Sequence, residues 1–382
     1  MTTVFFWPSA TVNSFYHPKA AVGLLWLLAL LSVPVDSYTT MRNPWVRRLS
    51  WWILVQFGVL YVMSGSIQQN LLGVPFGPWT IFPTLLVLGS LWFAEKAVRS
   101  AAHEDRWVAV ANALCLSGLV VILVGWAQFF GIDQFEVGSS NPALPGHNVL
   151  GTGRASSTFG NTMVSMGYLG LVTPLYLVFR PLRYRVAFVL AMGLLAVSGA
   201  ALGLVAAVIG SLVVLLLTRQ WWFVMGLGVL SGAGAWWKLS HGSEFFSITA
   251  RPLIWQYVLD AWKPVGWTGR GLGAVGHEFS RTKVAGLETG FEHAHNDFLQ
   301  GVNELGLIGW GLCAAMVGWT VWKTFKAPLT VLQAGWLGVI ASYAVVMGFG
   351  FPHAIFPCTL AWLMAWAGLE WSIAQEGRDV SA

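Results

Sequence analysis

Two histidines separated by a single residue, His293 and His295, are the groups best suited to exchange a proton near neutral pH. An imidazole has an ordinary pKa of about 6.5, so it can act as a general base toward a hydroxyl group. The residues that follow predict a helix with Asp297, Gln300 and Glu304 on one face, at positions i, i+3 and i+7. This pattern favours a polar site at a helix N-terminus, where main-chain N–H groups attract anions.

Three arginines lie in segments suited to binding phosphate, because one guanidinium can contact two oxygens of a phosphate at once. Arg251 begins a predicted short helix in a long polar segment. Arg270 lies among the glycines of 264–273, whose turns can direct backbone N–H groups toward an anion. Arg154 precedes the hydroxyl side chains of 156–158, just before an apolar run. A lone arginine beside a membrane is most often a contact for lipid headgroups, which is the alternative for Arg154 and Arg270.

The rest of the chain must hold these residues at a membrane, since 56% of it is apolar and only 10% is charged. A soluble domain is about 25% charged, so this composition excludes an ordinary cytosolic protein, and its apolar content excludes disorder. We therefore expect an all-α polytopic membrane protein of eleven or twelve spans, forming one transmembrane domain over 1–382. The eleven clearest apolar runs lie near 20–35, 50–67, 80–95, 107–131, 162–179, 185–199, 200–217, 221–237, 305–322, 329–350 and 354–374.

Basic residues indicate the orientation of these spans, because short cytoplasmic loops are enriched in Lys and Arg. Counted from the N-terminus, the odd-numbered loops hold twelve Lys and Arg, whereas the short even-numbered loops hold only Arg154. We expect the odd loops and the C-terminus in the cytoplasm, and the large outer loop (239–296), which contains short helices, on the opposite side. Seven of the eight histidines fall on that side, so the chemistry is expected there.

Several other features are not expected from this sequence. The net charge of +5 is explained by cytoplasmic loops, so it does not indicate nucleic-acid binding. All three cysteines lie inside apolar runs, which predicts no disulfide framework. The segment Met1–Lys19 has no basic stretch before an apolar core, so no cleavable signal peptide is expected.

A metal site is not expected either. The pair His293 and His295 lacks further spaced His or Cys ligands, and the outer loops contain no Asp-x-Asp pair that would hold Mg²⁺ or Mn²⁺. We therefore expect no metal and no cofactor, and activity in the presence of EDTA.

Three motifs together resemble the O-antigen ligase and polymerase superfamily of bacterial envelope glycosyltransferases, over about residues 150–325. They are Arg154-Ala-Ser-Ser-Thr-Phe-Gly-Asn161, Arg251-x-x-Ile-Trp255, and His293-Ala-His295-Asn296 through Glu304-x-Gly306-x-x-Gly309. The chain departs from the family pattern at Thr162-Met163, where a further Asn after a Pro is common. It also has Ser198-Gly199-Ala200 where the family often has an Arg after a Ser, so Arg154 or Arg270 would have to supply that anion contact.

The resemblance implies a metal-independent, inverting glycosyltransferase of the GT-C type in the bacterial cytoplasmic (inner) membrane, with its active site facing the periplasm. The donor would be a glycan on undecaprenyl pyrophosphate. The acceptor would be a sugar hydroxyl, on lipid A-core for an O-antigen ligase or on another lipid-linked glycan for an O-antigen polymerase. Both enzymes serve lipopolysaccharide biosynthesis. Both are in contact with membrane lipid, and neither needs nucleic acid.

For such a transfer we expect the following roles for the candidate residues. His295 is the expected base or acceptor-orienting residue, with His293 as the alternative. Three arginines would bind the pyrophosphate: Arg251, Arg154 and Arg270. Four further residues would support the site: Asn296, Asp297, Gln300 and Glu304.

Two functions of other classes compete with glycan transfer. A transporter of lipid-linked glycans would place ionisable groups in mid-membrane and often repeats its halves, whereas this chain gathers its charges in one outer loop and shows no internal repeat. A structural scaffold would leave Arg251 and His295 unexplained. The sequence does not separate ligase from polymerase, and the ligase is our first hypothesis.

Overall fold

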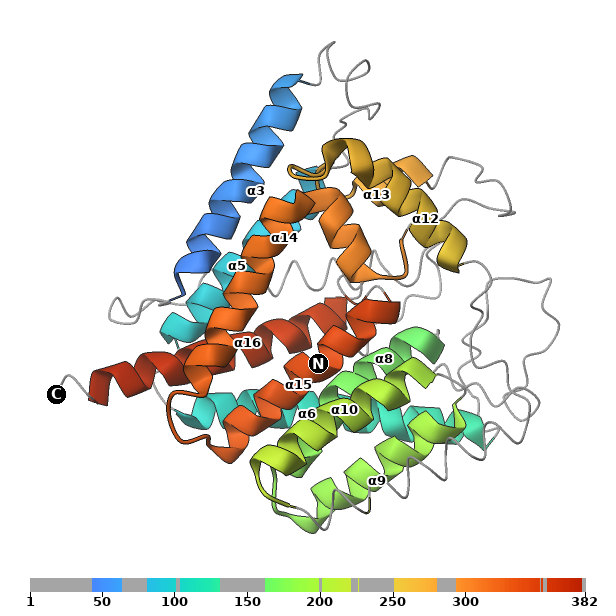
Figure 1. Ribbon diagram of the computed structural model, residues 1–382. Coiled ribbons are helices and arrows are strands. Elements are labelled where there is room, and N and C mark those ends of the chain that lie inside the picture. The colour runs from blue at the N-terminus through green and yellow to red at the C-terminus, as the bar shows by residue number, and fades with distance from the viewer. Residues whose placement is uncertain are drawn as a thin grey trace.

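The computed structural model describes residues 43–63, 81–100, 104–130, 162–198, 201–220, 226, 251–279, 293–350, 352 and 356–379. All regular structure within these ranges is helical, and they contain no strand (Figure 1). The α-helices are α3 (Pro44–Met63), α5 (Ile81–Ser100), α6 (Glu104–Phe129), α8 (Thr162–Val172), α9 (Leu182–Val197), α10 (Ala201–Leu217), α12 (Arg251–Trp262), α13 (Ala274–Phe279), α14 (Asp297–Thr324), α15 (Val331–Phe349) and α16 (Phe356–Asp379). Two short 3₁₀ helices are η3 (Thr173–Leu177) and η4 (Lys263–Val265).

The described helices confirm the expected all-α polytopic membrane fold. Every predicted span coincides with one of them except 20–35 and 221–237, which lie outside the described residues apart from Gly226. Three of the helices, α6, α14 and α15, are long and apolar enough to cross a membrane. The predicted division between two spans at Ser198 is present, and α12 and α13 are the short helices expected in the large outer loop.

Small residues allow α10 to pack closely between α8 and α15, whose ribbons lie beside it in Figure 1. A Cβ atom added to Gly170 of α8 would lie 2.5 Å from the main-chain oxygen of Gly203 in α10. One added to Gly210 would lie 2.5 Å from the main-chain oxygen of Gly338 in α15. Such backbone contacts bring helices together through van der Waals packing, which is the main attraction between helices in lipid.

A buried polar cluster joins α3, α14 and α16. Asn43, just before α3, donates from Nδ2 to the Met316 main-chain oxygen at 2.9 Å, to Thr320 Oγ1 at 3.0 Å and to Glu370 Oε1 at 2.9 Å. The Thr320 hydroxyl also bonds Glu370, and Trp366 Nε1 donates to Thr320 Oγ1 at 2.9 Å. Because these groups come from three helices, their mutual bonds fix how the helices pack.

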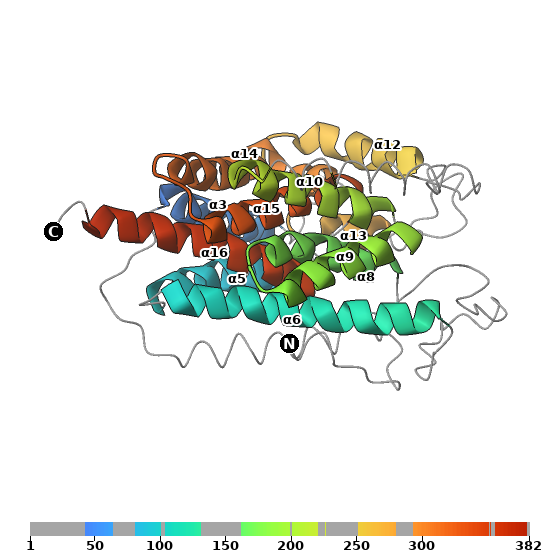
Figure 2. The ribbon, with the colours of Figure 1, turned by 90° about the horizontal axis from the view of Figure 1, so that it is seen from below.

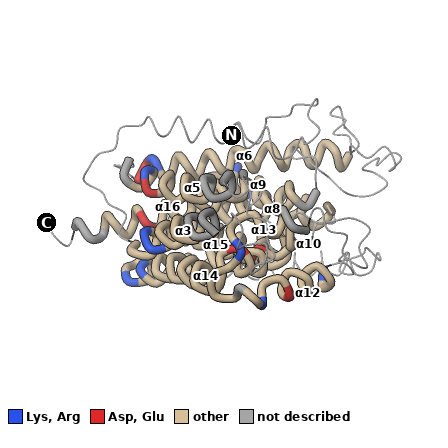
Figure 3. The backbone as a smooth tube through the Cα atoms, turned by 90° about the horizontal axis from the view of Figure 1, so that it is seen from above, with Lys and Arg blue, Asp and Glu red and all other residues tan. Residues whose placement is uncertain are grey.

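The charged residues gather mainly at the ends of helices. Figure 3 shows most of the Lys and Arg at the end of the bundle from which the C-terminus emerges, and a smaller group near α12 and α13. Several of these cations lie over aromatic rings: Arg48 over Trp45 at 4.5 Å, Lys96 over Trp92 at 4.7 Å and Lys326 over Trp322 at 4.9 Å. Aromatic and basic side chains together are typical of a membrane–water boundary. In Figure 2, α6, α15 and α16 run roughly parallel, and α12 lies at the edge of the bundle away from the C-terminus.

Candidate active site

Helix α14 is broken at Gly306, where the backbone has φ 72° and ψ 175° (Figure 1). The segment 266–271, which belongs to the long stretch between α10 and α14, fills the break. A Cβ atom on Gly306 would lie 2.5 Å from the Gly269 nitrogen, and one on Gly269, which also has φ 72°, would lie 2.5 Å from the Glu304 oxygen. The polar turns of α14 therefore do not run straight into the span, since the backbone of 266–271 occupies the path that a continuous helix would need.

Main-chain hydrogen bonds join the broken helix to this loop in both directions. Four of them link the two segments: Arg270 N to Asn303 O at 2.9 Å, Gly271 N to Glu304 O at 2.8 Å, Leu307 N to Gly266 O at 2.9 Å and Ile308 N to Trp267 O at 3.2 Å. Helix ends leave N–H and C=O groups without partners inside the helix. The loop supplies partners to both ends at the break, which holds Arg270 beside the second turn of α14.

Two side chains of α3 complete the same junction and were not identified from the sequence. Gln56 donates from Nε2 to the Thr268 oxygen at 2.6 Å and to the Glu304 oxygen at 2.7 Å. Trp52 donates from Nε1 to the Leu305 oxygen at 3.1 Å. A buried amide inside an apolar span was the signal available, because polar groups are costly in a membrane unless they are bonded.

The segment before α14 holds both histidines against α12. Trp255 Nε1 donates to the Ala294 oxygen at 3.0 Å, and the Ala294 nitrogen donates to Gln300 Oε1 at 3.2 Å. His295 has φ 51°, a left-handed conformation that is uncommon outside glycine. The bonds to Ala294 therefore hold the backbone of His295 in a conformation that a loose loop would avoid.

The polar residues of the first turns of α14 face inward. Asp297, Gln300 and Glu304 are each 4% exposed, whereas Phe298 is 38% exposed. Gln300 donates from Nε2 to Glu304 Oε1 at 3.0 Å. The two carboxylates therefore do not face water, and the apolar side of these turns is the outward one.

Asn296 and Asn303 have structural contacts in this region. Asn296 is the N-cap of α14, and its Oδ1 accepts from the Leu299 nitrogen at 3.1 Å. Asn303 donates from Nδ2 to the Val258 oxygen of α12 at 2.9 Å, and its buried Oδ1 has no hydrogen-bond partner among the described residues. Asn303 thus ties α12 to α14, which the sequence did not predict.

The charge of Arg251 influences the pKa of His295. Burial lowers the pKa of His295, the positive charge of Arg251 lowers it further, and the carboxylate of Asp297 opposes both. Burial also lowers the pKa of the Arg251 guanidinium. The imidazole is therefore neutral at neutral pH, as a general base must be.

The structure brings most of the predicted site residues to one end of the molecule, near α12 and the N-terminus of α14. Arg251, His293 and His295 lie around the contact between Trp255 and Ala294. Arg270 is buried at the break in α14. Arg154 lies outside the described residues. In the part of the chain that the structure covers, no three His, Cys, Asp or Glu side chains are placed to hold a metal ion.

This end of the molecule falls within the segment that resembles known proteins. Residues 186–314 match the family model described as O-antigen ligase. These residues are therefore similar to that family. The match confirms the resemblance to the O-antigen ligase and polymerase superfamily and supports a glycosyltransferase of ligase or polymerase type. A search of curated proteins found no match to the chain.

The O-antigen ligase match spans the described segments α9 to the middle of α14. It includes both histidines, Arg251 and Arg270, and it begins after Arg154. The family assignment therefore rests on the same part of the chain as the candidate active site.

Proposed function

We propose that this protein is an O-antigen ligase that moves a glycan from undecaprenyl pyrophosphate to a sugar hydroxyl of lipid A-core, at the periplasmic face of the cytoplasmic membrane. The observation that carries the proposal is the neutral, partly buried imidazole of His295 within electrostatic range of the Arg251 guanidinium. A base beside a cation suits a reaction in which a hydroxyl attacks and a pyrophosphate departs.

The reaction needs one proton acceptor and one anion site. The acceptor oxygen attacks the anomeric carbon, the bond from that carbon to the phosphate oxygen breaks, and the imidazole of His295 takes the hydroxyl proton. Attack from the face opposite the leaving group inverts the anomeric configuration. The departing lipid pyrophosphate keeps the bonding electrons, so it needs charge stabilisation and no proton.

Arg251 is the proposed contact for the pyrophosphate, since its charge is permanent and its two-pronged geometry matches phosphate oxygens. Arg270 and Arg154 are proposed as further contacts. Asp297 favours the protonated form of His295, so its carboxylate would stabilise the imidazolium that forms during transfer. Gln300 and Glu304 support the segment through their bond to each other and through the bond from Ala294 to Gln300.

The test is a purified transfer assay with a lipid-linked glycan donor and lipopolysaccharide that lacks O-antigen as acceptor. His295→Ala should lower the rate by about 10²–10⁴, the usual contribution of a general base. Arg251→Gln should also lower it, whereas Arg183→Gln, which changes an exposed arginine at the start of α9, should not. Near-full transfer by His295→Ala together with inactive His293→Ala would exchange the two histidine roles.

Complementation separates the ligase from its nearest rival. In a strain without a ligase, expression should restore full-length glycan on lipid A-core. Restored chain length in a strain without a polymerase, and no attachment to lipid A-core, would instead identify a polymerase. Movement of lipid-linked glycan across vesicles without transfer would contradict both.

A further inference from the structure

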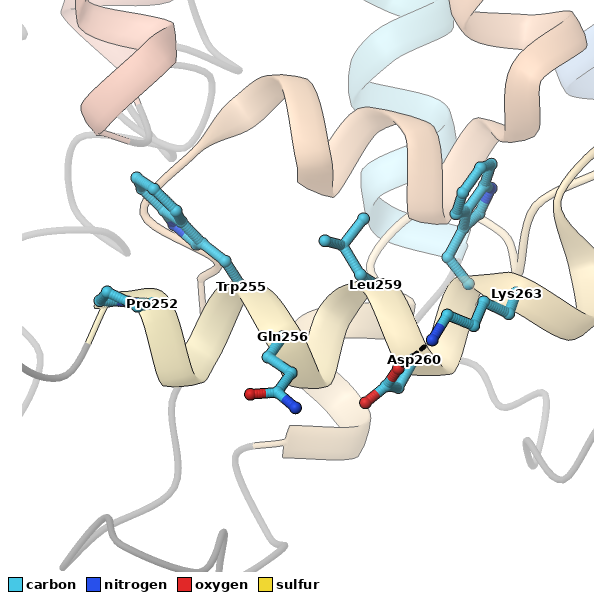
Figure 4. Close-up of a pocket in the computed structure, with 7 residues that line it drawn as sticks. Pro252, Trp255, Gln256, Leu259, Asp260 and Lys263 are labelled. Atoms are coloured by element: carbon cyan, nitrogen blue, oxygen red, sulfur yellow. Dashed lines mark hydrogen bonds and ion pairs between the residues drawn. The ribbon is translucent and has the colours of Figure 1, made fainter.

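A groove runs along the outer side of α12. It encloses about 480 Å³ and is lined by seven residues: Pro252, Trp255, Gln256, Leu259, Asp260, Trp262 and Lys263 (Figure 4). The opposite side of the helix carries Ile254 and Val258, which are buried against Val275 and Ala294. Burial of that side fixes α12 on the molecule and leaves the groove open.

The two indoles of the groove are held in place by their own hydrogen bonds. Trp255 Nε1 donates to the Ala294 oxygen at 3.0 Å, and Trp262 Nε1 donates to the Gly266 oxygen at 3.1 Å. Seven residues along a helix correspond to a rise of about 10 Å, so the two rings mark two positions along the groove. Rigid aromatic rings lose little conformational entropy when a ligand stacks on them.

Polar side chains alternate with these apolar ones. Lys263 Nζ and Asp260 Oδ1 form an exposed ion pair with a separation of 2.6 Å. Gln256 lies one helical turn before Asp260, along the same edge of α12 (Figure 4). A sugar ring has apolar C–H faces that stack on an indole and hydroxyl groups that bond carboxylates, amides and ammonium groups. The lining therefore matches the chemistry of a glycan.

We propose that the groove on α12 binds the glycan portion of a substrate, adjoining the histidine segment. This inference rests on the proposed glycan transfer. Trp255 connects the two regions directly, because its ring lines the groove and its Nε1 bonds the residue between His293 and His295. A glycan whose reacting sugar lies at His295 can continue along α12 toward Trp262.

A bilayer surface is the competing occupant, since tryptophan and lysine are also common at membrane boundaries. The groove favours the glycan because Gln256, Asp260 and Lys263 line the same hollow as the indoles. Covering a carboxylate with lipid would be costly.

Direct binding tests the proposal without relying on transfer. The probe is the soluble polysaccharide released by mild acid from the source strain's lipopolysaccharide, titrated calorimetrically into the full-length protein in detergent. Trp262→Ala should weaken binding on the order of tenfold, as loss of a stacked aromatic anchor does, and Asp260→Asn should weaken it less. Trp322→Ala removes a tryptophan that is 52% exposed near the C-terminal end of α14, and it should bind as the wild type does.

Equal binding by Trp262→Ala and the wild type would overturn the groove assignment. The effect of His295→Ala on transfer would still stand in that case, so the two proposals fail separately. Transfer kinetics then identify the source of the sugar. A raised KM of Trp262→Ala for the lipid-linked donor assigns the groove to the donor glycan, and a raised KM for the lipopolysaccharide assigns it to the acceptor.

Cysteine labelling tests the bilayer as occupant. Gln256→Cys in membrane vesicles open to the reagent should react with a water-soluble maleimide, and the polysaccharide should slow that reaction. The wild type gives the background, which comes from the partly exposed Cys313, since Cys115 and Cys358 are buried. Labelling in detergent but not in membranes would show that lipid covers the groove, which would overturn the proposal.

Discussion

At the scale of single residues, the site is a balance of charges around one imidazole. Burial and Arg251 lower the pKa of His295, while Asp297 raises it. The neutral form is the one that accepts a proton, so in the proposed mechanism Arg251 helps to keep the base ready at neutral pH. Once the proton has been taken, Asp297 would stabilise the positive charge of the imidazolium and the pyrophosphate would neutralise that of Arg251.

The pH profile of transfer should report this balance. Because the pKa of His295 is lowered, kcat/KM should stay high as the pH falls to about 6.5 and be lost only below it. Arg251→Gln removes a lowering charge, so the acidic limb should move to higher pH. Asp297→Asn removes a raising charge, so the limb should move to lower pH. Shifts in the same direction, or none, would contradict His295 as the titrating group.

The chemistry also predicts independence from metal ions. A lipid pyrophosphate can leave when guanidinium groups neutralise its charge, so a divalent cation is not required. Transfer measured in EDTA should match transfer in untreated buffer. If EDTA abolishes activity and Mn²⁺ restores it, the charge stabilisation comes from a metal instead of from arginines.

At the scale of elements, the break in α14 holds the site together. The histidine segment directly precedes the first turns of the helix, which carry the polar face, and the remainder of the helix is a membrane span. The loop 266–271 forms hydrogen bonds with both parts of the helix. Gln56 and Trp52 attach this junction to α3. Helix α3 thus supports the site, although none of its residues has a predicted role in the chemistry.

A glycine substitution tests the break directly. Gly306→Ala should destabilise the protein by more than the roughly 1–3 kcal/mol that a left-handed non-glycine residue costs, because its Cβ also meets the backbone of 268–269. Gly311→Ala, in the same helix with nothing within 4 Å of its added Cβ, should be neutral or up to about 1 kcal/mol more stable. Thermal unfolding in detergent measures both, and equal effects would show that the break imposes no constraint.

At the scale of the whole molecule, the two ends of α14 take part in different sets of contacts. Its N-terminal end forms the candidate site, and its C-terminal half enters the buried cluster of Asn43, Thr320 and Glu370. Glu370 is 2% exposed, and its Oε2 has no hydrogen-bond partner in the described part of the chain. The cluster therefore uses the carboxyl group as an acceptor that joins three helices.

Two substitutions at Glu370 separate hydrogen bonding from charge. Glu370→Gln keeps an oxygen for Asn43 and Thr320, so stability should stay close to that of the wild type. Glu370→Leu removes the acceptor and should cost about 1–3 kcal/mol, the usual penalty for leaving buried donors without a partner. The midpoint of thermal unfolding distinguishes them. Equal destabilisation by both would mean that the cluster requires a charged carboxylate.

The sequence by itself determined the membrane fold and indicated a candidate region for the chemistry. Apolar runs long enough to span a bilayer leave few alternatives to helices, because every backbone polar group in lipid must be bonded internally. Apart from 221–237, which lies outside the described residues except for Gly226, the predicted spans between α3 and α16 accordingly match the described helices. The division predicted at 198–200 separates α9 from α10. The motifs around Arg251 and His295 lie within the segment that matches the O-antigen ligase family model.

Only the tertiary structure decided how these residues are held. Periodicity placed Asp297, Gln300 and Glu304 on one face, but it carried no information about whether that face meets water or protein. The break at Gly306 depends on the backbone of a loop more than thirty residues earlier in the chain, and Gln56 acts from a helix more than two hundred residues away from Glu304. Such contacts join segments that are distant along the chain, so local sequence patterns cannot reveal them.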